Sequence, residues 1–298
     1  MQCKSSGGQF QAIVATFVLI LSTTIFFIPI LFMGLLKLYP NERWQALCTQ
    51  GVDAIVTRWC DTNNWYIDKT QSIHWQISGL EHLDNKHWYL VIANHQSWLD
   101  IVILQRLLNH KIPILKFFIK DQLKWVPLLG FSWWAMGCPF MKRYSKKYLE
   151  KNPHKQGKDL ISTRKAIEKF KKKPASIMNF VEGTRFSPQK KAQQNSPYRY
   201  LLKPKAGGIG FILNAMGEQL TGMLDVTIIY PQKPSLWDFL CKRISKVTIH
   251  VRQIPIPKQF TLESSMQHSQ TKAKFIDWLN EKWMEKDNLI SSLKLELE

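Results

Sequence analysis

Cysteines are few in this chain of 298 residues, and none of them forms a Cys-x-x-Cys pair. Their odd number and scattered spacing indicate neither a disulfide framework nor a zinc site. We therefore expect a reducing, cytoplasmic setting. The five positions are Cys3, Cys48, Cys60, Cys138 and Cys241.

Acidic residues are also scarce. The chain has 22 Asp and Glu against 41 Lys and Arg, which gives a formal net charge of +19. Such an excess predicts an anionic partner, and nucleic acid, a phospholipid surface and an acidic protein all meet that description. The charge alone does not choose among them.

Charged residues are absent from residues 5–36. Within that stretch, residues 12–36 are mostly large and apolar and exceed the roughly 20 residues needed to cross a bilayer. Because no small-residue cleavage site follows, we expect a retained anchor and not a signal peptide. Pro29 leaves open a single span or an interfacial or re-entrant hairpin of two shorter helices. A buried core helix is the remaining alternative.

Residues 1–40 are thus predicted to anchor the protein in a membrane, and residues 41–298 to form a separate domain. Lys37, Arg43 and the basic remainder follow the anchor, whereas only Lys4 precedes it. Because positively charged flanks stay on the cytoplasmic side, we expect the domain on the cytoplasmic face of a bacterial inner membrane.

After the anchor, strand-like and helix-like segments alternate. This alternation predicts an α/β fold with a mixed, largely parallel sheet flanked by helices, and an active site in loops beyond the carboxyl ends of the strands. Strands are expected at residues 72–78, 87–93, 113–119, 138–142, 175–181, 223–230 and 246–254. Helices are expected at residues 41–58, 97–109, 128–136, 158–172, 205–216 and 271–285. Residues 187–203 are polar and aperiodic and are predicted to form a long loop.

The segment "NHQSWLD" places His95 and Asp100 where a strand-like run ends and a helix-like run begins. Residues five apart do not share a helix face, so the two side chains meet only if His95 lies in the preceding turn. Asp100 would then hold one ring nitrogen and leave the other free to take a proton. A capping box, in which Ser97 caps the helix and Asp100 binds the first amides, is the competing and compatible interpretation.

A serine hydrolase is a weak interpretation, because the chain has no Gly-x-Ser-x-Gly elbow. Ser97 is near His95 in sequence, but it would need an oxyanion hole and an orienting acid of its own. Without a protein nucleophile, the natural partner of His95 is a substrate hydroxyl, which it would activate as a general base for attack on a carbonyl.

The segment "FVEGTR" follows another predicted strand. Gly183 permits a tight turn before Thr184, and Arg185 offers a planar fork suited to phosphate. Glu182 could hold Arg185 or a substrate hydroxyl. The alternative is a plain turn with a local ion pair between Glu182 and Arg185.

Two further segments carry candidate anion contacts. "GCPFMKR" ends a predicted strand with Arg143, although basic residues at strand ends are common. "KPKAGGIGF" opens a predicted helix at Lys205, where the amides of Gly207 and Gly208 could bind phosphate. It lacks the spacing of a P-loop.

Together and in this order, these segments resemble the glycerolipid or lysophospholipid acyltransferase family. The resemblance covers about residues 41–254. It consists of the His-x4-Asp motif from His95 to Asp100, a Gly-x-x-Phe-Ile-x-Arg-like motif ending at Arg143 with Met141 in place of Ile, the motif Glu182-Gly183-Thr184-Arg185, and a fourth region at residues 203–208 with the strand to Pro231. Two departures concern acceptor binding: Val181 stands where many members have Pro, and residues 226–231 lack the Val-Pro-x-x-Pro form.

The resemblance implies one-step transfer of a fatty acyl chain from acyl-CoA or acyl-carrier protein to the hydroxyl of 1-acylglycerol 3-phosphate, giving phosphatidic acid. His95 would be the general base and Asp100 its orienting partner. Arg143, Glu182, Gly183, Thr184, Arg185 and Lys205 would bind the substrate. A thioester is already reactive, so neither a metal nor a cofactor is expected.

Other functions remain as alternatives. The acceptor could be another lysophospholipid or glycerol 3-phosphate, or water, which would make the protein a membrane thioesterase or lipase. A membrane-tethered nucleic-acid binder would account for the charge. It would leave the apolar segment and the order of the motifs unexplained, so no nucleic-acid partner is expected.

Overall fold

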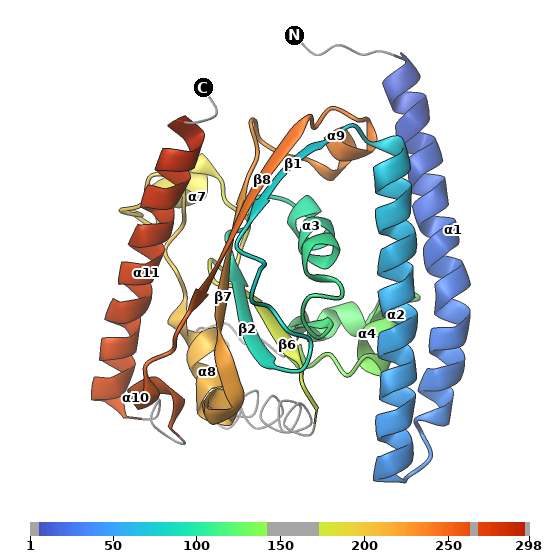
Figure 1. Cartoon of the computed structure of the whole chain (residues 1–298), viewed down its shortest axis with the longest axis horizontal. Coiled ribbons are helices and arrows are strands. Elements are labelled where there is room, and N and C mark those ends of the chain that lie inside the picture. Colours follow the sequence, from blue (N-terminus) through green and yellow to red (C-terminus); the bar gives the residue numbers. More distant parts are fainter. Residues whose placement is uncertain (1–5, 142–172, 263–267, 296–298) are drawn as a thin grey trace, which may run out of the picture.

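The computed structural model describes residues 6–141, 173–262 and 268–295. A six-stranded sheet in the order β1-β8-β7-β2-β6-β3 forms its centre (Figure 1). Within it, only β7 and β8 are antiparallel, so the predicted mixed, largely parallel α/β sheet is confirmed. The strands are β1 (His74–Ser78), β2 (Trp88–Ala93), β3 (Leu115–Phe117), β6 (Ser176–Phe180), β7 (Leu220–Ile229) and β8 (Lys246–Ile254). A separate parallel pair joins β4 (Ile119–Lys120) to β5 (Phe140–Met141).

Helices cover both faces of the sheet. Longer helices are α1 (Ser6–Leu36), α2 (Glu42–Thr70), α3 (Leu99–Leu108), α8 (Ala206–Met216) and α11 (Ser269–Leu295). Shorter ones are the 3₁₀ turns η1 (Asp121–Trp125) and η4 (Gly217–Gln219), and the α-helices α4 (Leu129–Ala135), α7 (Pro188–Gln193), α9 (Leu236–Leu240) and α10 (Lys258–Thr261). In Figure 1, α3 lies between the sheet and the pair α1 and α2, while α8, α10 and α11 lie on the opposite side.

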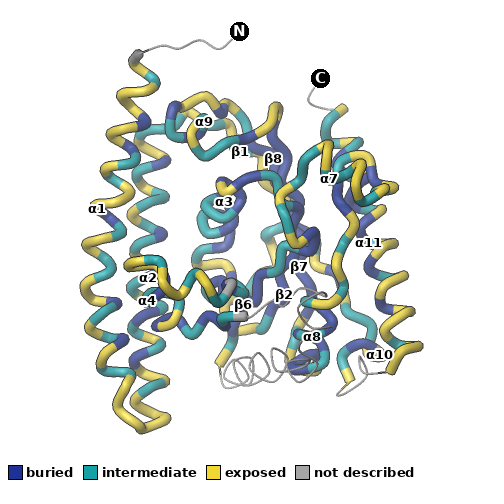
Figure 2. The backbone as a smooth tube through the Cα atoms, turned by 180° about the vertical axis from the view of Figure 1, so that it is seen from behind, coloured by how far each residue is buried: buried dark blue, intermediate teal, exposed yellow. Residues whose placement is uncertain are grey.

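The inner strands β2, β6 and β7 are mostly buried because each face of the sheet supports its own apolar core (Figure 2). Leu90 and Ile92 of β2 point into the core under α8 and α11, whereas Tyr89 and Val91 point into the core under α3. Strands covered on both faces read as continuous apolar runs, which is why the run from Trp88 to Ala93 does not alternate.

Helix α1 is unbroken through Pro29, so the alternative of two shorter helices is wrong. It packs along α2 and also contacts α4 and α9. Only 17% of its most apolar window is buried, which argues against a buried core helix. By length and composition it could cross a membrane.

Some predicted boundaries differ from the structure. Helix α2 continues to Thr70 and α11 to Leu295, because their later turns keep apolar residues on the packed face. The strand predicted at 113–119 divides between β3 and β4, which belong to different sheets. The predicted loop 187–203 contains α7, capped by Ser187. The helix predicted at 158–172, together with Arg143, lies outside the described residues.

Candidate active site

Three neighbouring strands deliver the candidate residues to one edge of the sheet. Strands β7, β2 and β6 are adjacent and parallel, so their carboxyl ends lie together. His95 follows β2, the segment from Glu182 to Arg185 follows β6, and Tyr230 follows β7. The candidate residues therefore lie beyond the carboxyl ends of the strands, as the sequence predicts.

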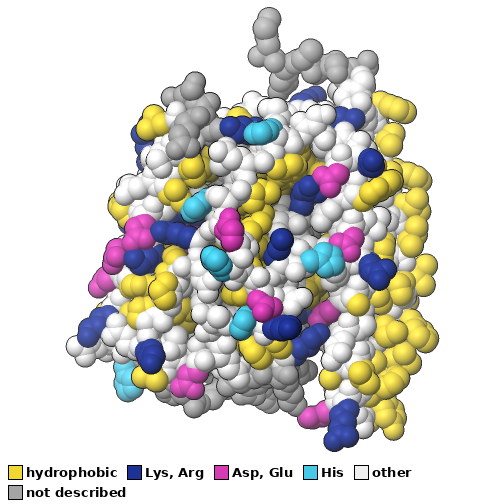
Figure 3. Space-filling model, in the orientation of Figure 1, with side chains coloured by type: hydrophobic (Ala, Val, Ile, Leu, Met, Phe, Trp, Pro, Cys, Tyr) yellow, Lys and Arg dark blue, Asp and Glu magenta, His cyan; other side chains and the backbone are white. Residues whose placement is uncertain are grey.

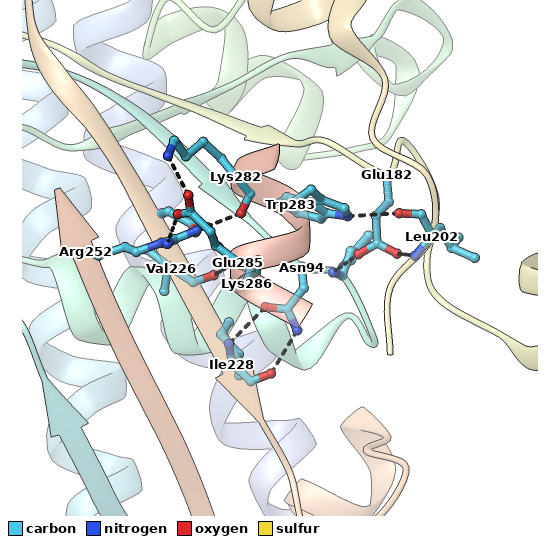
Figure 4. Close-up of polar contacts among 12 residues, drawn as sticks. Asn94, Glu182, Leu202, Val226, Ile228, Arg252, Lys282, Trp283, Glu285 and Lys286 are labelled. Carbon is cyan, nitrogen blue, oxygen red and sulfur yellow. Dashed lines mark hydrogen bonds and ion pairs between the residues drawn. The ribbon is translucent and has the colours of Figure 1, made fainter. Parts of the chain in front are cut away.

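Asn94 lets the chain leave the sheet just before His95. Its buried side chain imitates a strand backbone: Nδ2 donates to the carbonyl of Ile228 at 2.8 Å, and Oδ1 accepts the Ile228 amide at 2.9 Å (Figure 4). The amide side chain extends the pairing of β2 with β7 beyond the last strand residue. His95 can therefore occupy a turn whose start is fixed by the sheet.

Asp100 holds this turn and the histidine together. Nδ1 of His95 donates to Oδ2 of Asp100 at 2.9 Å. The same oxygen accepts the amides of Gln96 at 2.6 Å and Ser97 at 2.8 Å, while Ser97 Oγ accepts the Leu99 amide at 3.2 Å. Asp100 therefore contacts both His95 and the first amides, as the two interpretations predict. The N-cap of α3 is Trp98 and not Ser97, so the predicted capping role of Ser97 is wrong.

Tyr230 binds the other oxygen of Asp100. Its hydroxyl donates to Oδ1 at 2.6 Å, and both residues are buried. Burial and the adjacent Asp100 raise the pKa of Tyr230 well above its usual value, so the phenol remains a proton donor. Sequence reasoning ended a strand at Tyr230 but gave it no role; its position at the end of a central strand was the available signal.

The second nitrogen of His95 is left for chemistry. The ring stacks on Phe180, with centroids 3.9 Å apart and planes 16° from parallel. Its side chain is 13% exposed. Among the described residues Nε2 has no hydrogen-bond partner, so with Nδ1 donating to Asp100 the free nitrogen is the basic one in the neutral ring.

The turn from Glu182 to Arg185 supports the His95 loop from the next strand. Gly183 has a φ of +68°, which favours glycine. The fully buried Glu182 accepts the amides of His95 at 2.9 Å and Leu202 at 3.0 Å, instead of pairing with Arg185. Burial raises its pKa to about 7, against the opposing effect of these two hydrogen bonds.

Three cations gather at this turn. The guanidinium of Arg185 lies 5.3 Å from the ring centre of Trp98, which belongs to the His95 loop. A β-carbon at Gly183 would lie 3.2 Å from Nζ of Lys205. Nζ of Lys190 donates to the Thr184 hydroxyl at 2.8 Å. Lys190 was not predicted, although Ser187 followed by Pro188 is a helix-start signal that places it close to the turn.

The turn from Glu182 to Arg185 is also connected to helix α11. Trp283 of α11 is fully buried, and its Nε1 donates to the Leu202 carbonyl at 2.9 Å (Figure 4). The backbone amide of Leu202 donates to the Glu182 carboxylate. Contacts therefore run from α11 through Leu202 and Glu182 to the backbone of His95.

No group of three or more His, Cys, Asp or Glu that could hold a metal ion occurs within residues 6–141, 173–262 and 268–295.

The model of the acyltransferase family matches residues 74–231, more than half of the chain. The chain belongs to the acyltransferase family. This match spans the loops after β2, β6 and β7 that form the candidate site.

Relatives and a solved structure agree with that assignment. Mouse 1-acyl-sn-glycerol-3-phosphate acyltransferase epsilon is 26% identical over 69% of this chain and 58% of its own. The yeast 1-acyl-sn-glycerol-3-phosphate acyltransferase is 34% identical over 37% of this chain and 32% of its own. The chain thus spans less than two thirds of these relatives. The LPA acyltransferase PlsC of Thermotoga maritima shares the fold, with a TM-score of 0.57 at 17% identity, covering 96% of this chain and 98% of that one.

Proposed function

We propose that this acyltransferase moves a fatty acyl chain from acyl-CoA or acyl-carrier protein to the free hydroxyl of 1-acylglycerol 3-phosphate, which gives phosphatidic acid. The observation that carries the proposal is an oriented histidine, His95, with a free basic nitrogen beside a turn that carries three cations. The names of the mouse and yeast relatives support the choice of acceptor.

In the proposed reaction, Nε2 of His95 takes the proton of the acceptor hydroxyl as its oxygen attacks the thioester carbonyl. Asp100 keeps Nδ1 protonated and stabilises the imidazolium that forms. Collapse of the tetrahedral intermediate breaks the carbon–sulfur bond. The proton on Nε2 passes to the departing thiolate, so the histidine is restored without a metal or a cofactor.

The cations would hold the acceptor's phosphate close to this base. Arg185 provides a planar fork over the ring of Trp98, and Lys205 lies beside Gly183. The Phe186 amide donates to the His95 carbonyl at 2.7 Å. A backbone hydrogen bond therefore joins the loop of His95 to the turn from Glu182 to Arg185, which we call the phosphate turn. The short glycerol backbone of the acceptor then joins phosphate and hydroxyl across adjacent loops. Glu182 would act by holding both loops.

The acyl chain needs an apolar space. A cavity lies between α1, α2, α3 and α9, and α3 begins beside Asp100. We propose this cavity as the acyl site, because apolar side chains dominate its wall. They include Leu19, Trp59, Ile67, Val102, Leu236 and Phe239.

A membrane location would bring the site to its lipid substrates. Phe10, Phe17 and Ile28 on the outer side of α1 are 68%, 64% and 65% exposed. Figure 3 shows hydrophobic side chains along this edge of the molecule. Helix α2, packed along α1, carries Asp53 and Arg58, which would be costly to bury in hydrocarbon. The proposed location is the cytoplasmic face of a bacterial inner membrane, with α1 held in the lipid interface.

An acyl-transfer assay in detergent tests the proposal, with labelled acyl-CoA or acyl-carrier protein and 1-acylglycerol 3-phosphate. Wild-type protein should form labelled phosphatidic acid, and His95→Ala should abolish it while the protein stays folded. Asp100→Asn should lower kcat on the order of a thousandfold or more. Activity retained in a folded His95→Ala protein would refute the mechanism. Free fatty acid as the main product would favour a thioesterase or lipase.

A further inference from the structure

Lys190 is held over the phosphate turn by neutral groups. Its Nζ donates to the Thr184 hydroxyl at 2.8 Å and to the Arg185 carbonyl at 3.0 Å. An ammonium has three hydrogen-bond donors, so these contacts leave one available. No carboxylate within the described part of the chain pairs with Lys190.

The short helix α7 fixes this placement. Ser187 Oγ accepts the Lys190 amide at 3.3 Å, and Pro188 occupies the first turn. Helix α7 therefore starts shortly after Arg185 and directs the side chain of Lys190 toward Thr184 and Arg185. Lys191 is the next residue of the same helix and points about 100° away.

We infer that Lys190 determines acceptor specificity by binding the acceptor's phosphate and favouring a phosphate monoester over a phosphodiester. The inference rests on the proposed function and deepens it. Arg185, Lys205 and Lys190 bring three positive charges to adjacent residues of one turn. A phosphate monoester carries a charge of about −1.5 to −2 near pH 7, whereas a diester carries a single charge and has one fewer free oxygen.

Kinetics of the full chain in detergent test this role with two acceptors. These are 1-acylglycerol 3-phosphate, a monoester, and 1-acylglycerophosphoglycerol, a diester. Lys190→Gln should raise KM for the monoester about tenfold, the scale of one charge-assisted hydrogen bond, and leave KM for the diester and both kcat values within about twofold. Lys190→Arg should retain most of the preference. Lys191→Gln is the matched control and should resemble wild type.

An equal rise in KM for both acceptors, or a fall in kcat alone, would overturn the inference in favour of a purely structural role. Binding of glycerol 3-phosphate, measured by calorimetry, separates this result from failure of the proposed function. If wild type transfers acyl chains to neither acceptor, weaker binding confined to Lys190→Gln still supports the inference. Equal binding by Lys190→Gln, Lys191→Gln and wild type refutes it.

Discussion

Both oxygens of the Asp100 carboxylate accept hydrogen bonds from protein donors. The two loop amides of Gln96 and Ser97 and the ring of His95 bind one oxygen, and Tyr230 binds the other. A buried carboxylate is costly unless it is hydrogen-bonded, and charge-assisted bonds to it are short and strong. The side chain is therefore held in one orientation, and so is the histidine.

Tyr230→Phe tests the contribution of the fourth donor. We expect kcat to fall about tenfold with KM nearly unchanged, because Asp100 stays buried but loses one hydrogen bond that orients it. The free energy of unfolding should fall by about 1–3 kcal/mol. Steady-state kinetics and denaturant unfolding measure the two effects. Tyr39→Phe, at an exposed position, is the control, and an unchanged kcat would show that Tyr230 does not help to position Asp100.

Glu182 should make stability depend on pH. Its pKa rises from an ordinary 4.5 to about 7 on folding, so between these values the folded protein keeps a proton that the unfolded chain has lost. The stability that this group contributes is complete below about pH 4.5 and is lost as the pH rises through about 7. The melting temperature of wild type should therefore fall relative to that of Glu182→Gln, whose side chain does not titrate, as the pH rises from about 5 to about 8. A pH-independent difference would contradict the assigned pKa.

At the scale of residues, the sequence predicted the pair His95 and Asp100, because a motif of fixed spacing lay between a strand and a helix. It also selected Arg185 and Lys205 as candidates for substrate binding. It missed Tyr230, whose role depends on a strand more than a hundred residues from Asp100 along the chain. Lys190 was missed because its helix lay within a segment whose composition is that of a loop.

Among the elements, α11 contributes Lys286 to a buried ion pair with Asp225 of β7. Nζ of Lys286 lies 2.6 Å from Oδ1 of Asp225, and both side chains are almost fully buried. Burial lowers the pKa of Lys286, and the Asp225 carboxylate opposes this effect. Arg252 binds the other oxygen of Asp225 at 2.9 Å and reaches Glu285 and the Lys282 carbonyl (Figure 4).

Lys286→Met should destabilise the protein by about 3–5 kcal/mol, because it leaves a buried carboxylate with only Arg252 as a charged partner. Adding Asp225→Asn should recover part of this loss, since the uncompensated charge is then removed. Chemical unfolding of both variants measures the difference. Lys274→Met, on the exposed side of α11, is the control; a double variant no more stable than the single one would show that packing, not charge, sets the cost.

Sequence patterns located the elements better than their ends. The strands that became β2, β6, β7 and β8 were found because they are apolar and β-branched and are bounded by polar segments. The divided strand at β3 and β4 was not, because only pairing partners decide which sheet a residue joins. The later turns of α2 and α11 carry mixed polar sequence and are helical through tertiary packing.

At the scale of the molecule, charge and apolar surface lead to one prediction about membranes. The apolar outer side of α1 should hold the protein on lipid vesicles at high salt, whereas the net charge of +19 adds a salt-sensitive attraction to anionic lipid. Flotation with neutral and anionic vesicles over a range of salt concentrations separates the two contributions. Replacing Phe10, Phe17 and Ile28 with Ser should abolish the salt-resistant part. Unchanged flotation would remove this side of α1 from membrane binding.

The contact between Trp283 and Leu202 has a consequence for protein synthesis. The loops that carry His95 and Glu182 are translated well before α11, and domains fold as the chain emerges from the ribosome. Until Trp283 is synthesised, the Leu202 segment that binds Glu182 lacks the hydrogen bond that Trp283 donates to it. A nascent chain would therefore already contain His95 and Asp100 but hold them less firmly. The proposed activity would reach its full level only after the codons of α11 have been translated.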